Sequence, residues 1–267
     1  MIDIKPYIFA FLDVETTGLS AWFGDRVCEI AIERVHRNEI QDTFTTLVNP
    51  EREISPGAAR VNGLTNDDLC DAPRFAEIAN RVESLLADAV IVCHNSPFDL
   101  GFIDNEFSRL EEKFKAPQVV DTLWLAREFF YFDSNSLGSI AEELEISTPN
   151  AHRALGDVVT TRRVFQHFLR ELSKEGFTHL DELVSGYVSQ YKSPDEILLP
   201  PIIEEALKNG ERLHITYKNQ KGGQSKRWIT LKQVLTAYNS TYLIAYCHLR
   251  ESERNFRLDR IVEMKTE

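Results

Sequence analysis

The distribution of apolar residues over the first 170 positions predicts an α/β domain. Apolar runs at about 7–14, 27–36 and 40–48, joined by short polar connections, predict three strands of an antiparallel meander. Further along, helical spacing alternates with short apolar runs. Helices are predicted at about 74–87, 97–114, 122–131, 136–145 and 154–172, and strands at 89–93 and 118–121. A meander followed by strand–helix units predicts a mixed five-stranded sheet with helices on its faces.

The pattern changes near residue 173, where the periodicity weakens. The segment KSPDEILLPP that follows carries three prolines, which disfavour both helix and central strand. Beyond it we expect a short helix that ends at Gly210 and then four or five short strands. The predicted parts are a large α/β domain at 1–175, a helical connector and linker at 176–200, and a small all-β domain at 201–267.

Composition narrows the class of protein. The chain has 267 residues, of which 43% are hydrophobic and 27% charged, as in ordinary globular proteins. The first residues lack a basic flank followed by an apolar run, and nowhere do about eighteen apolar residues follow one another without a charge. The four cysteines lie far apart and form no CxxC pair, which indicates reduced, structural cysteines. We therefore expect a cytoplasmic protein with no membrane partner.

The charge is distributed unevenly along the chain. A net charge of −12 by itself argues against a nucleic-acid partner, because phosphate binding depends on Lys and Arg. However, residues 1–193 hold 18 basic and 32 acidic side chains, whereas 194–267 hold 12 basic and 10 acidic ones. Within 212–260, ten Lys or Arg face three Asp or Glu. The acidity belongs to the first domain, and the second contains a locally basic segment.

Two carboxylates end the first predicted strand. In YIFAFLDVETTGL, Asp13 and Glu15 lie two residues apart, so a strand places both on one side. Two like charges at the end of a buried strand repel each other unless a cation offsets them. Oxygen ligands suit Mg²⁺ or Mn²⁺, and the scattered cysteines offer no zinc site. The alternative is a pair of ordinary strand-end acids in solvent.

Two later segments carry further candidates for this chemistry. Asp99 follows a buried strand in VCHNSPFDLGFI, where His94 and Asn95 could instead cap the next helix. In NAHRALGDVVTTRRVF, Asp157 lies in the first turns of a helix and His152 precedes that helix. A neutral imidazole near an attacking water could take its proton, because the unperturbed pKa of about 6.5 lies near working pH. The alternative makes His152 a loop residue and Asp157 a helix-dipole acid.

Together these segments resemble the DEDDh exonucleases, a family whose best-known member is the proofreading subunit of bacterial replicative DNA polymerase. FLDVETTGL, HNSPFDLGFI and HRALGD look like its three motifs, in the same order and at similar intervals, over about residues 7–172. The resemblance implies a ribonuclease H-like fold and 3′→5′ exonuclease activity. It also implies a set of catalytic residues that hold two ions of Mg²⁺ or Mn²⁺, namely Asp13, Glu15, Asp99 and Asp157, with His152 as general base.

The same resemblance implies contacts with the 3′-terminal nucleotide. The expected substrate-binding residues are Thr16, Thr17, Leu19, Asn95 and Phe98. Among them, Thr16 and Thr17 would act through the backbone, while Leu19 and Phe98 would offer apolar surfaces to the last bases, a sequence-tolerant contact. The chain departs from the family at RVNGLT, where many relatives carry a histidine in place of Asn62. No catalytic role is assigned to that stretch.

The C-terminal part resembles a WYL domain, a small Sm-like or SH3-like β-barrel of bacterial regulators and nucleic-acid enzymes. The matching segments are LPPIIEEALKNGERLHITYKN, KRWITL, STYLIAY and FRLDRI, with Thr241 in place of the usual tryptophan. The resemblance suggests that a surface for single-stranded nucleic acid or a nucleotide effector is lined by Arg227, Tyr242, Arg257 and Arg260. The alternative is a solvated charged face with Tyr242 in the core. Alternation places Tyr242 and Leu243 on opposite faces, so both cannot be core.

Three functions compete for the whole chain. We favour an exonuclease that acts on single-stranded 3′ ends of DNA or RNA, with DNA favoured, and uses the basic domain to hold its strand. A second hypothesis is a regulatory protein that senses nucleic acid and keeps the nuclease fold as a scaffold, although all four acids and the histidine are retained. A third is a polymerase-associated proofreading subunit. Because a basic β-domain replaces a long polymerase-binding tail, a free-standing repair, processing or defence nuclease is preferred.

Overall fold

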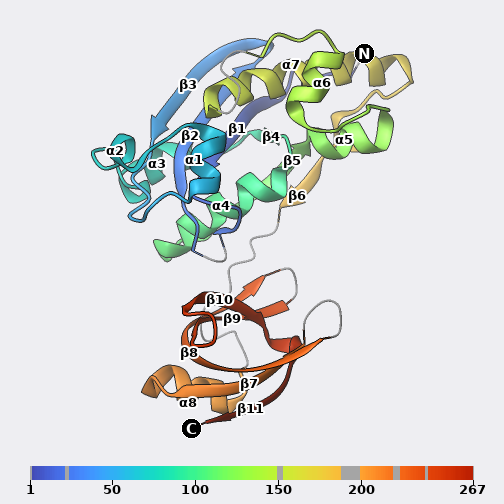
Figure 1. Ribbon diagram of the computed structural model, residues 1–267. Coiled ribbons are helices and arrows are strands. Elements are labelled where there is room, and N and C mark those ends of the chain that lie inside the picture. Colours follow the sequence, from blue (N-terminus) through green and yellow to red (C-terminus); the bar gives the residue numbers. More distant parts are fainter. Residues whose placement is uncertain are drawn as a thin grey trace. The chain divides into compact units, whose positions relative to one another are not determined.

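The chain forms two compact units, Met1–Ser189 and Gln190–Glu267 (Figure 1). The computed structural model describes residues 2–21, 24–148, 153–187, 199–218, 223–237 and 240–266. The limits predicted for the linker, 176–200, stay a prediction, because residues 188–198 lie outside the described ranges. No helix in the described ranges is long and apolar enough to cross a membrane.

The first unit is built on a mixed sheet with strand order β3-β2-β1-β4-β5-β6. Its strands are β1 (Ile8–Thr16), β2 (Val27–His36), β3 (Glu39–Leu47), β4 (Val90–Cys93), β5 (Ala116–Asp121) and β6 (Ser185–Tyr187). The first three form the predicted antiparallel meander, β4 pairs parallel with β1, and β5 pairs parallel with β4. The short edge strand β6 was not predicted. Its three residues, SGY, are too few to show an alternating pattern.

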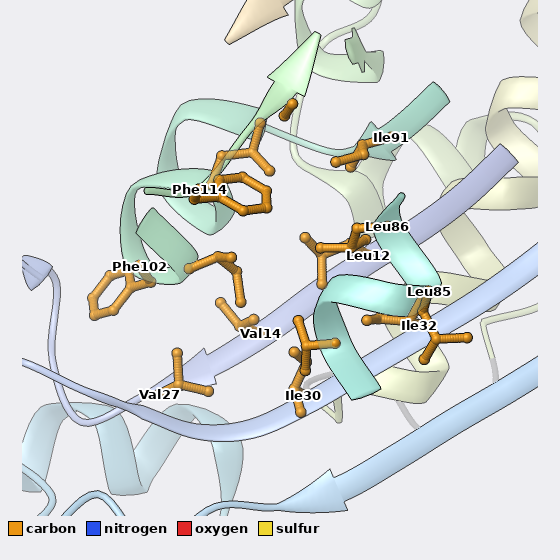
Figure 2. Packing of buried hydrophobic residues seen from close by; sticks show 14 of the residues in the cluster. Leu12, Val14, Val27, Ile30, Ile32, Leu85, Leu86, Ile91, Phe102 and Phe114 are labelled. Atoms are coloured by element: carbon orange, nitrogen blue, oxygen red, sulfur yellow. The ribbon is translucent and has the colours of Figure 1, made fainter. Parts of the chain in front are cut away.

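Helices cover both faces of this sheet. They are α1 (Pro56–Asn62), α2 (Asn66–Leu69), α3 (Phe75–Leu86), α4 (Ser96–Arg109), α5 (Thr122–Phe129), α6 (Leu137–Glu143) and α7 (Ala154–Lys174). One core lies between the sheet and α3 and α4, and a second lies between the sheet and α5, α6 and α7. Figure 2 shows the first core, where Leu12 and Val14 of β1 lie near Leu86 of α3 and Phe102 of α4.

The central strand β1 shows how this packing orients the acidic end of the strand. Phe9 and Phe11 point toward α7, with ring centroids 5.4 and 5.8 Å from Phe165. Because side chains alternate along a strand, residues 9, 11, 13 and 15 share one face. Asp13 and Glu15 therefore continue the row of phenylalanines on the side where α7 begins.

The second unit combines one helix with an all-antiparallel sheet of order β10-β9-β8-β7-β11. Its elements are α8 (Pro201–Asn209), β7 (Arg212–Lys218), β8 (Gln224–Ala237), β9 (Ser240–Cys247), β10 (Ser252–Arg257) and β11 (Ile261–Thr266). The helix ends at Gly210, which has the left-handed φ of 67° that favours glycine. Ile203 and Ala206 of α8 are buried against Leu243 and Phe256 of the sheet. A 3₁₀ turn at Leu258–Arg260 separates β10 from β11.

Candidate active site

Three of the predicted acids come together where β1 ends and α7 begins. Asp13 and Glu15 lie on β1, and Asp157 lies in the first turn of α7. One carboxylate oxygen from each of the three residues lies within 4.8 Å of the other two. All three side chains are half-buried, so the cluster is open to a ligand while still shielded from bulk water.

The fourth acid, Asp99, adjoins this cluster from α4. It is 3% exposed, and its Oδ1 accepts a hydrogen bond of 3.1 Å from the backbone N–H of Val14, between the two acids of β1. Its charge also raises the pKa of Asp13. The second and third motifs are thus brought to the strand that carries the first.

Crowding makes the acids of β1 weak. Burial first, and then the charges of Asp99 and Asp157, raise the pKa of Asp13 well above its usual range. Burial, with Asp157 and Glu29, raises the pKa of Glu15 to about 8, against the opposing effects of Arg153 and Asn62. A cation would relieve this repulsion, and a hard oxygen donor set suits Mg²⁺ or Mn²⁺. The residues present therefore fit the divalent cation that the fold family implies.

Of the two histidines predicted near this site, the structure describes His94 and not His152. The predicted general base, His152, lies outside the described residues. His94 is held on both ring nitrogens, with Nδ1 2.9 Å from Thr122 Oγ1 and Nε2 3.0 Å from the carbonyl oxygen of Asn135. Burial lowers the pKa of His94, so it stays neutral and structural at neutral pH.

Two cavities meet at the acidic cluster, and Asp13, His94 and Asp157 line both. The first has a volume of about 670 Å³ and is partly walled by the apolar side chains of Leu19 and Val61. The second has a volume of about 760 Å³, and its wall is rich in hydroxyl groups from Ser136, Ser139, Ser147, Thr148 and Thr160. A chain-like ligand could occupy both cavities while its middle lies over the carboxylates.

Three of the predicted substrate-binding residues line the first cavity. Leu19 is 88% exposed at its rim, and Phe98 and Thr16 belong to its wall. The loop that presents Leu19 folds around Asp25, whose Oδ2 accepts a 3.1 Å hydrogen bond from the N–H of Ser20. A Cβ at Gly18 would collide with that carboxylate, which explains the glycine.

The other two predicted residues, Thr17 and Asn95, are not among the residues that line these two cavities. Thr17 is fully buried, and its Oγ1 accepts a hydrogen bond from the N–H of Arg26. Asn95 has a left-handed φ of 76° and makes no side-chain capping bond, while its N–H donates to Asp121. Both residues therefore make hydrogen bonds that stabilise the local backbone conformation.

Asn62 belongs to the site, although its segment was assigned no catalytic role from sequence. It is 5% exposed at the end of α1 and lines the first cavity. Its side chain hydrogen bonds to Glu15 and lowers the pKa of that carboxyl group. Its Oδ1 accepts from the N–H of Leu64 at 3.0 Å, which fixes the amide in place. The departure from the family pattern at this position was the signal available.

In the second unit the sheet register separates the four predicted residues. Tyr242 pairs with Arg257 across β9 and β10, on the face opposite Leu243, which is fully buried. Arg227 pairs instead with Ile215, a core residue, and its guanidinium lies 5.6 Å from the ring of Phe256. Paired residues share a face, so Arg227 lies on the core side of the sheet.

The remaining member of that set, Arg260, lies in the 3₁₀ turn that follows β10. Next to it, Asp259 forms an ion pair with Arg257 at 2.6 Å. The hydrogen bond to Arg257, and then the charges of both Arg257 and Arg260, lower the pKa of Asp259.

Two family models match the chain. A family model described as "Exonuclease" matches residues 10–165, more than half of the chain. The chain belongs to this exonuclease family. A second model, described as "WYL domain", matches residues 201–266. The resemblances to an exonuclease and to a WYL domain are both confirmed.

Curated relatives of the exonuclease are much longer proteins. The chain is 34% identical over 219 residues to "DNA polymerase III PolC-type" of Bacillus cereus, which covers 78% of this chain and 15% of that protein. It is also 34% identical over 183 residues to the protein of the same name from Bacillus subtilis, covering 67% and 13%. The chain thus spans about 15% of the length of these relatives.

Solved structures share the fold of the exonuclease domain. Exonuclease X in complex with 5′ overhanging duplex DNA has a TM-score of 0.51 at 23% identity, over 64% of this chain and 94% of that one. The nuclease domain of 3′hExo, described as a DEDDh family member bound to rAMP, has a TM-score of 0.54 at 18% identity, over 61% and 92%. The predicted ribonuclease H-like fold is confirmed, with β6 as an additional edge strand.

Proposed function

We propose that this protein is a divalent-metal-dependent 3′→5′ exonuclease that shortens single-stranded nucleic acid, DNA in preference to RNA, and releases nucleoside monophosphates. The observation that carries the proposal is the cluster of Asp13, Glu15 and Asp157, whose carboxylate oxygens lie within 4.8 Å of one another in a chain of the exonuclease family. A site that concentrates negative charge in this way favours cations over anions. It becomes useful for phosphate chemistry once a metal is held there.

The proposed ligands are the four acids, Asp13, Glu15, Asp99 and Asp157. Mg²⁺ or Mn²⁺, two ions per site, would supply Lewis-acid polarisation of the phosphate and a more acidic water. Asn62 and Arg153 favour the ionised form of Glu15, because each lowers its pKa against the effect of burial. His152 is the proposed general base, which takes the proton of the attacking water.

The first cavity is the proposed place of the 3′-terminal nucleotide. Leu19 and Phe98 offer apolar surfaces there, and Phe98 is supported from behind by Phe102, with ring centroids 5.0 Å apart. Packing against the face of a base tolerates any sequence, as a nuclease that degrades strands stepwise requires. Thr16 belongs to the same wall, and we propose that it acts through its backbone.

In the WYL domain we propose a weaker contact with nucleic acid or a nucleotide effector. Tyr242 and Arg257 are cross-strand neighbours, and Arg260 follows in the next turn. An aromatic ring beside guanidinium groups suits a base and its phosphates. Arg227, on the other face of the sheet, would support this surface from behind through its contact with Phe256.

A second candidate function is proofreading in association with a polymerase. The specific observation in its favour is the similarity to PolC-type polymerases of two Bacillus species. Because a WYL domain with a basic segment accompanies the exonuclease domain, we prefer a free-standing repair, processing or defence nuclease. Stable co-elution of the purified protein with a replicative polymerase on size exclusion would reverse that preference.

The test is digestion of 5′-labelled single-stranded DNA and RNA of the same sequence, in Mg²⁺, in Mn²⁺ and in EDTA. We expect a ladder that shortens from the 3′ end, faster on DNA, and no products in EDTA. Asp157→Asn, assayed in parallel, separates the protein's own activity from a contaminant. Internal cleavage, or equal digestion by the variant, would refute the proposal.

A further inference from the structure

Glu29 is a fifth carboxylate beside the acidic cluster, and it is only 4% exposed. In the register of β1 and β2 it lies directly opposite Glu15, so both side chains share one face of the sheet. It is not one of the four proposed ligands, and its charge raises the pKa of Asp13 and of Glu15. A buried charge that works against its neighbours needs a partner that compensates for it.

That partner is the start of α7. Glu29 Oε2 accepts from Arg153 Nε at 2.9 Å, and its Oε1 accepts from Arg153 Nη2 at 2.8 Å. The backbone N–H of Ala154 donates to the same carboxylate at 3.3 Å. Arg153 is the N-cap residue of α7 and makes no side-chain capping bond of its own. A carboxylate from β2 therefore supplies the acceptor and the negative charge that a helix N-terminus favours.

The bonds to Glu29 are one helical turn away from a cluster residue. The N–H of Asp157 donates to the carbonyl oxygen of Arg153 at 3.1 Å, within the first turn of α7. The strand that holds Glu29 is hydrogen-bonded along its length to the strand that holds Asp13 and Glu15. The fork from Arg153 to Glu29 thus links the start of α7, which carries Asp157, to the sheet that carries Asp13 and Glu15.

A second ion pair between the same two elements serves as a comparison. Glu33 of β2 is also 4% exposed, and its Oε2 accepts from Arg162 Nε of α7 at 2.7 Å. The two glutamates lie four positions apart on β2, and Arg162 lies nine positions after Arg153, the N-cap of α7. Unlike Glu29, Glu33 is not among the main causes of the raised pKa of Asp13 or Glu15. The Glu33–Arg162 pair therefore serves as a control, since it joins β2 to α7 in the same way but away from the site.

We propose that Glu29 and Arg153 are a positioning pair, which fixes the start of α7 against the sheet and so sets the spacing of Asp157 from Asp13 and Glu15. The proposal rests on the proposed function only in taking the acidic cluster as a divalent-cation site. Groups that orient the ligands of a metal contribute roughly 10–100-fold to metal affinity. Glu29 acts through the helix and need not touch substrate.

The experiment compares Glu29→Gln with Glu33→Gln in the full-length protein. Mn²⁺ binding is measured by isothermal titration calorimetry, together with thermal unfolding, kcat and KM on single-stranded DNA. We expect Glu29→Gln to weaken Mn²⁺ binding by roughly 10–100-fold and to lower kcat by at least about tenfold, with KM within about twofold. Both variants should lower the melting temperature by a similar amount, because each loses a charge that pairs with an arginine. In Glu33→Gln, however, Mn²⁺ affinity and kcat should stay within about twofold of the parent. Equal Mn²⁺ affinity and kcat in the two variants would overturn the proposal.

Arg153→Lys is a second variant, for the case that Glu29→Gln does not fold. It keeps the positive charge but loses the planar guanidinium fork. We expect it to fold and to bind Mn²⁺ several-fold more weakly than the parent, whereas parental affinity would overturn the proposal. The parent protein separates this idea from the proposed function. If it binds Mn²⁺ but digests no nucleic acid, the proposed function fails, and the positioning pair is still judged by the Mn²⁺ affinities of the variants.

Discussion

The two units of this chain treat charge in opposite ways. In the exonuclease domain, acids from β1, α4 and α7 converge, and burial with mutual repulsion raises the pKa of Glu15 to about 8. In the WYL domain the predicted residues are spread over two faces of a sheet, and Arg257 forms an exposed pair with Asp259. This is the difference we expect between a proposed cation site, which concentrates charges that are costly to bury, and a proposed binding surface, which uses exposed charges that cost little individually.

The largest expected effect comes from removing one acid of the cluster. Asp157→Asn should lower exonuclease activity by at least about a hundredfold, because the amide is a poorer ligand for a hard divalent cation. The folded protein should be as stable as the parent, or more stable, in EDTA, since the change relieves repulsion with Asp13. Initial rates on labelled DNA and melting curves in EDTA test both parts. Full activity of Asp157→Asn would show that the acidic cluster is not needed for hydrolysis, and the contrast between the two units would then have no functional meaning.

An intermediate effect is expected from the apolar wall of the first cavity. Leu19→Ala and Phe98→Ala should each raise KM for single-stranded DNA by roughly tenfold, because contact with one base contributes about 1–3 kcal/mol. Steady-state kinetics on a short oligonucleotide measure the change. Tyr131→Ala, at a residue that is 90% exposed and lines neither cavity, is a matched control and should leave KM unchanged. If all three variants behave alike, the cavity does not hold the terminal nucleotide.

The raised pKa of Glu15 predicts how the stability of the metal-free domain depends on pH. The folded pKa, about 8, lies above the ordinary value of 4.5. The folded state therefore binds more protons than the unfolded state between these values, and stability falls as pH rises from about 4.5 to 8. Melting temperatures in EDTA should decline over this window more steeply for the parent than for Glu15→Gln. Saturating Mg²⁺ should flatten the decline, and identical slopes would contradict the electrostatic account.

The smallest effect is expected in the WYL domain. The double variant Tyr242→Ala, Arg257→Ala should weaken equilibrium binding of single-stranded DNA several-fold, with a shallower dependence on salt, because one phosphate contact is lost. Fluorescence anisotropy at two salt concentrations measures this in the full-length protein with EDTA present. A loss as large as that caused by Leu19→Ala would mean that the WYL domain contributes as much to binding as the catalytic cavity.

The acids could be predicted from sequence because their chemistry fixes their residue types. Asp13 and Glu15 interrupt an apolar strand, where a charged side chain is rare unless it is paired or binds a metal ion. Asn62 could not be found in this way, since α1 and α2 are short and residues 49–73 show no apolar periodicity. Their local signals were the caps: Ser55 before Pro56, and the reciprocal bonds of Thr65 and Asp68.

The arrangement of the WYL domain was harder to predict for a geometric reason. Alternation correctly put Tyr242 and Leu243 on opposite faces, because that follows from any strand. The face of Arg227 depends on how β8 pairs with its two neighbours. An irregularity between Leu231 and Gln233 shifts the register of β8 against β9, so the two ends of β8 differ in which alternate residues face the core. No pattern in the sequence indicates such a shift.

The central claim is that the carboxylates at the end of β1 and the start of α7 hold the divalent cation that the hydrolysis requires. Anomalous diffraction from crystals grown with Mn²⁺ and a short single-stranded oligonucleotide tests it most directly. We predict Mn²⁺ peaks among Asp13, Glu15 and Asp157, beside the phosphate of the 3′-terminal nucleotide, and none in crystals of Asp13→Asn. A bound 3′ end with no Mn²⁺ at these carboxylates would contradict the account.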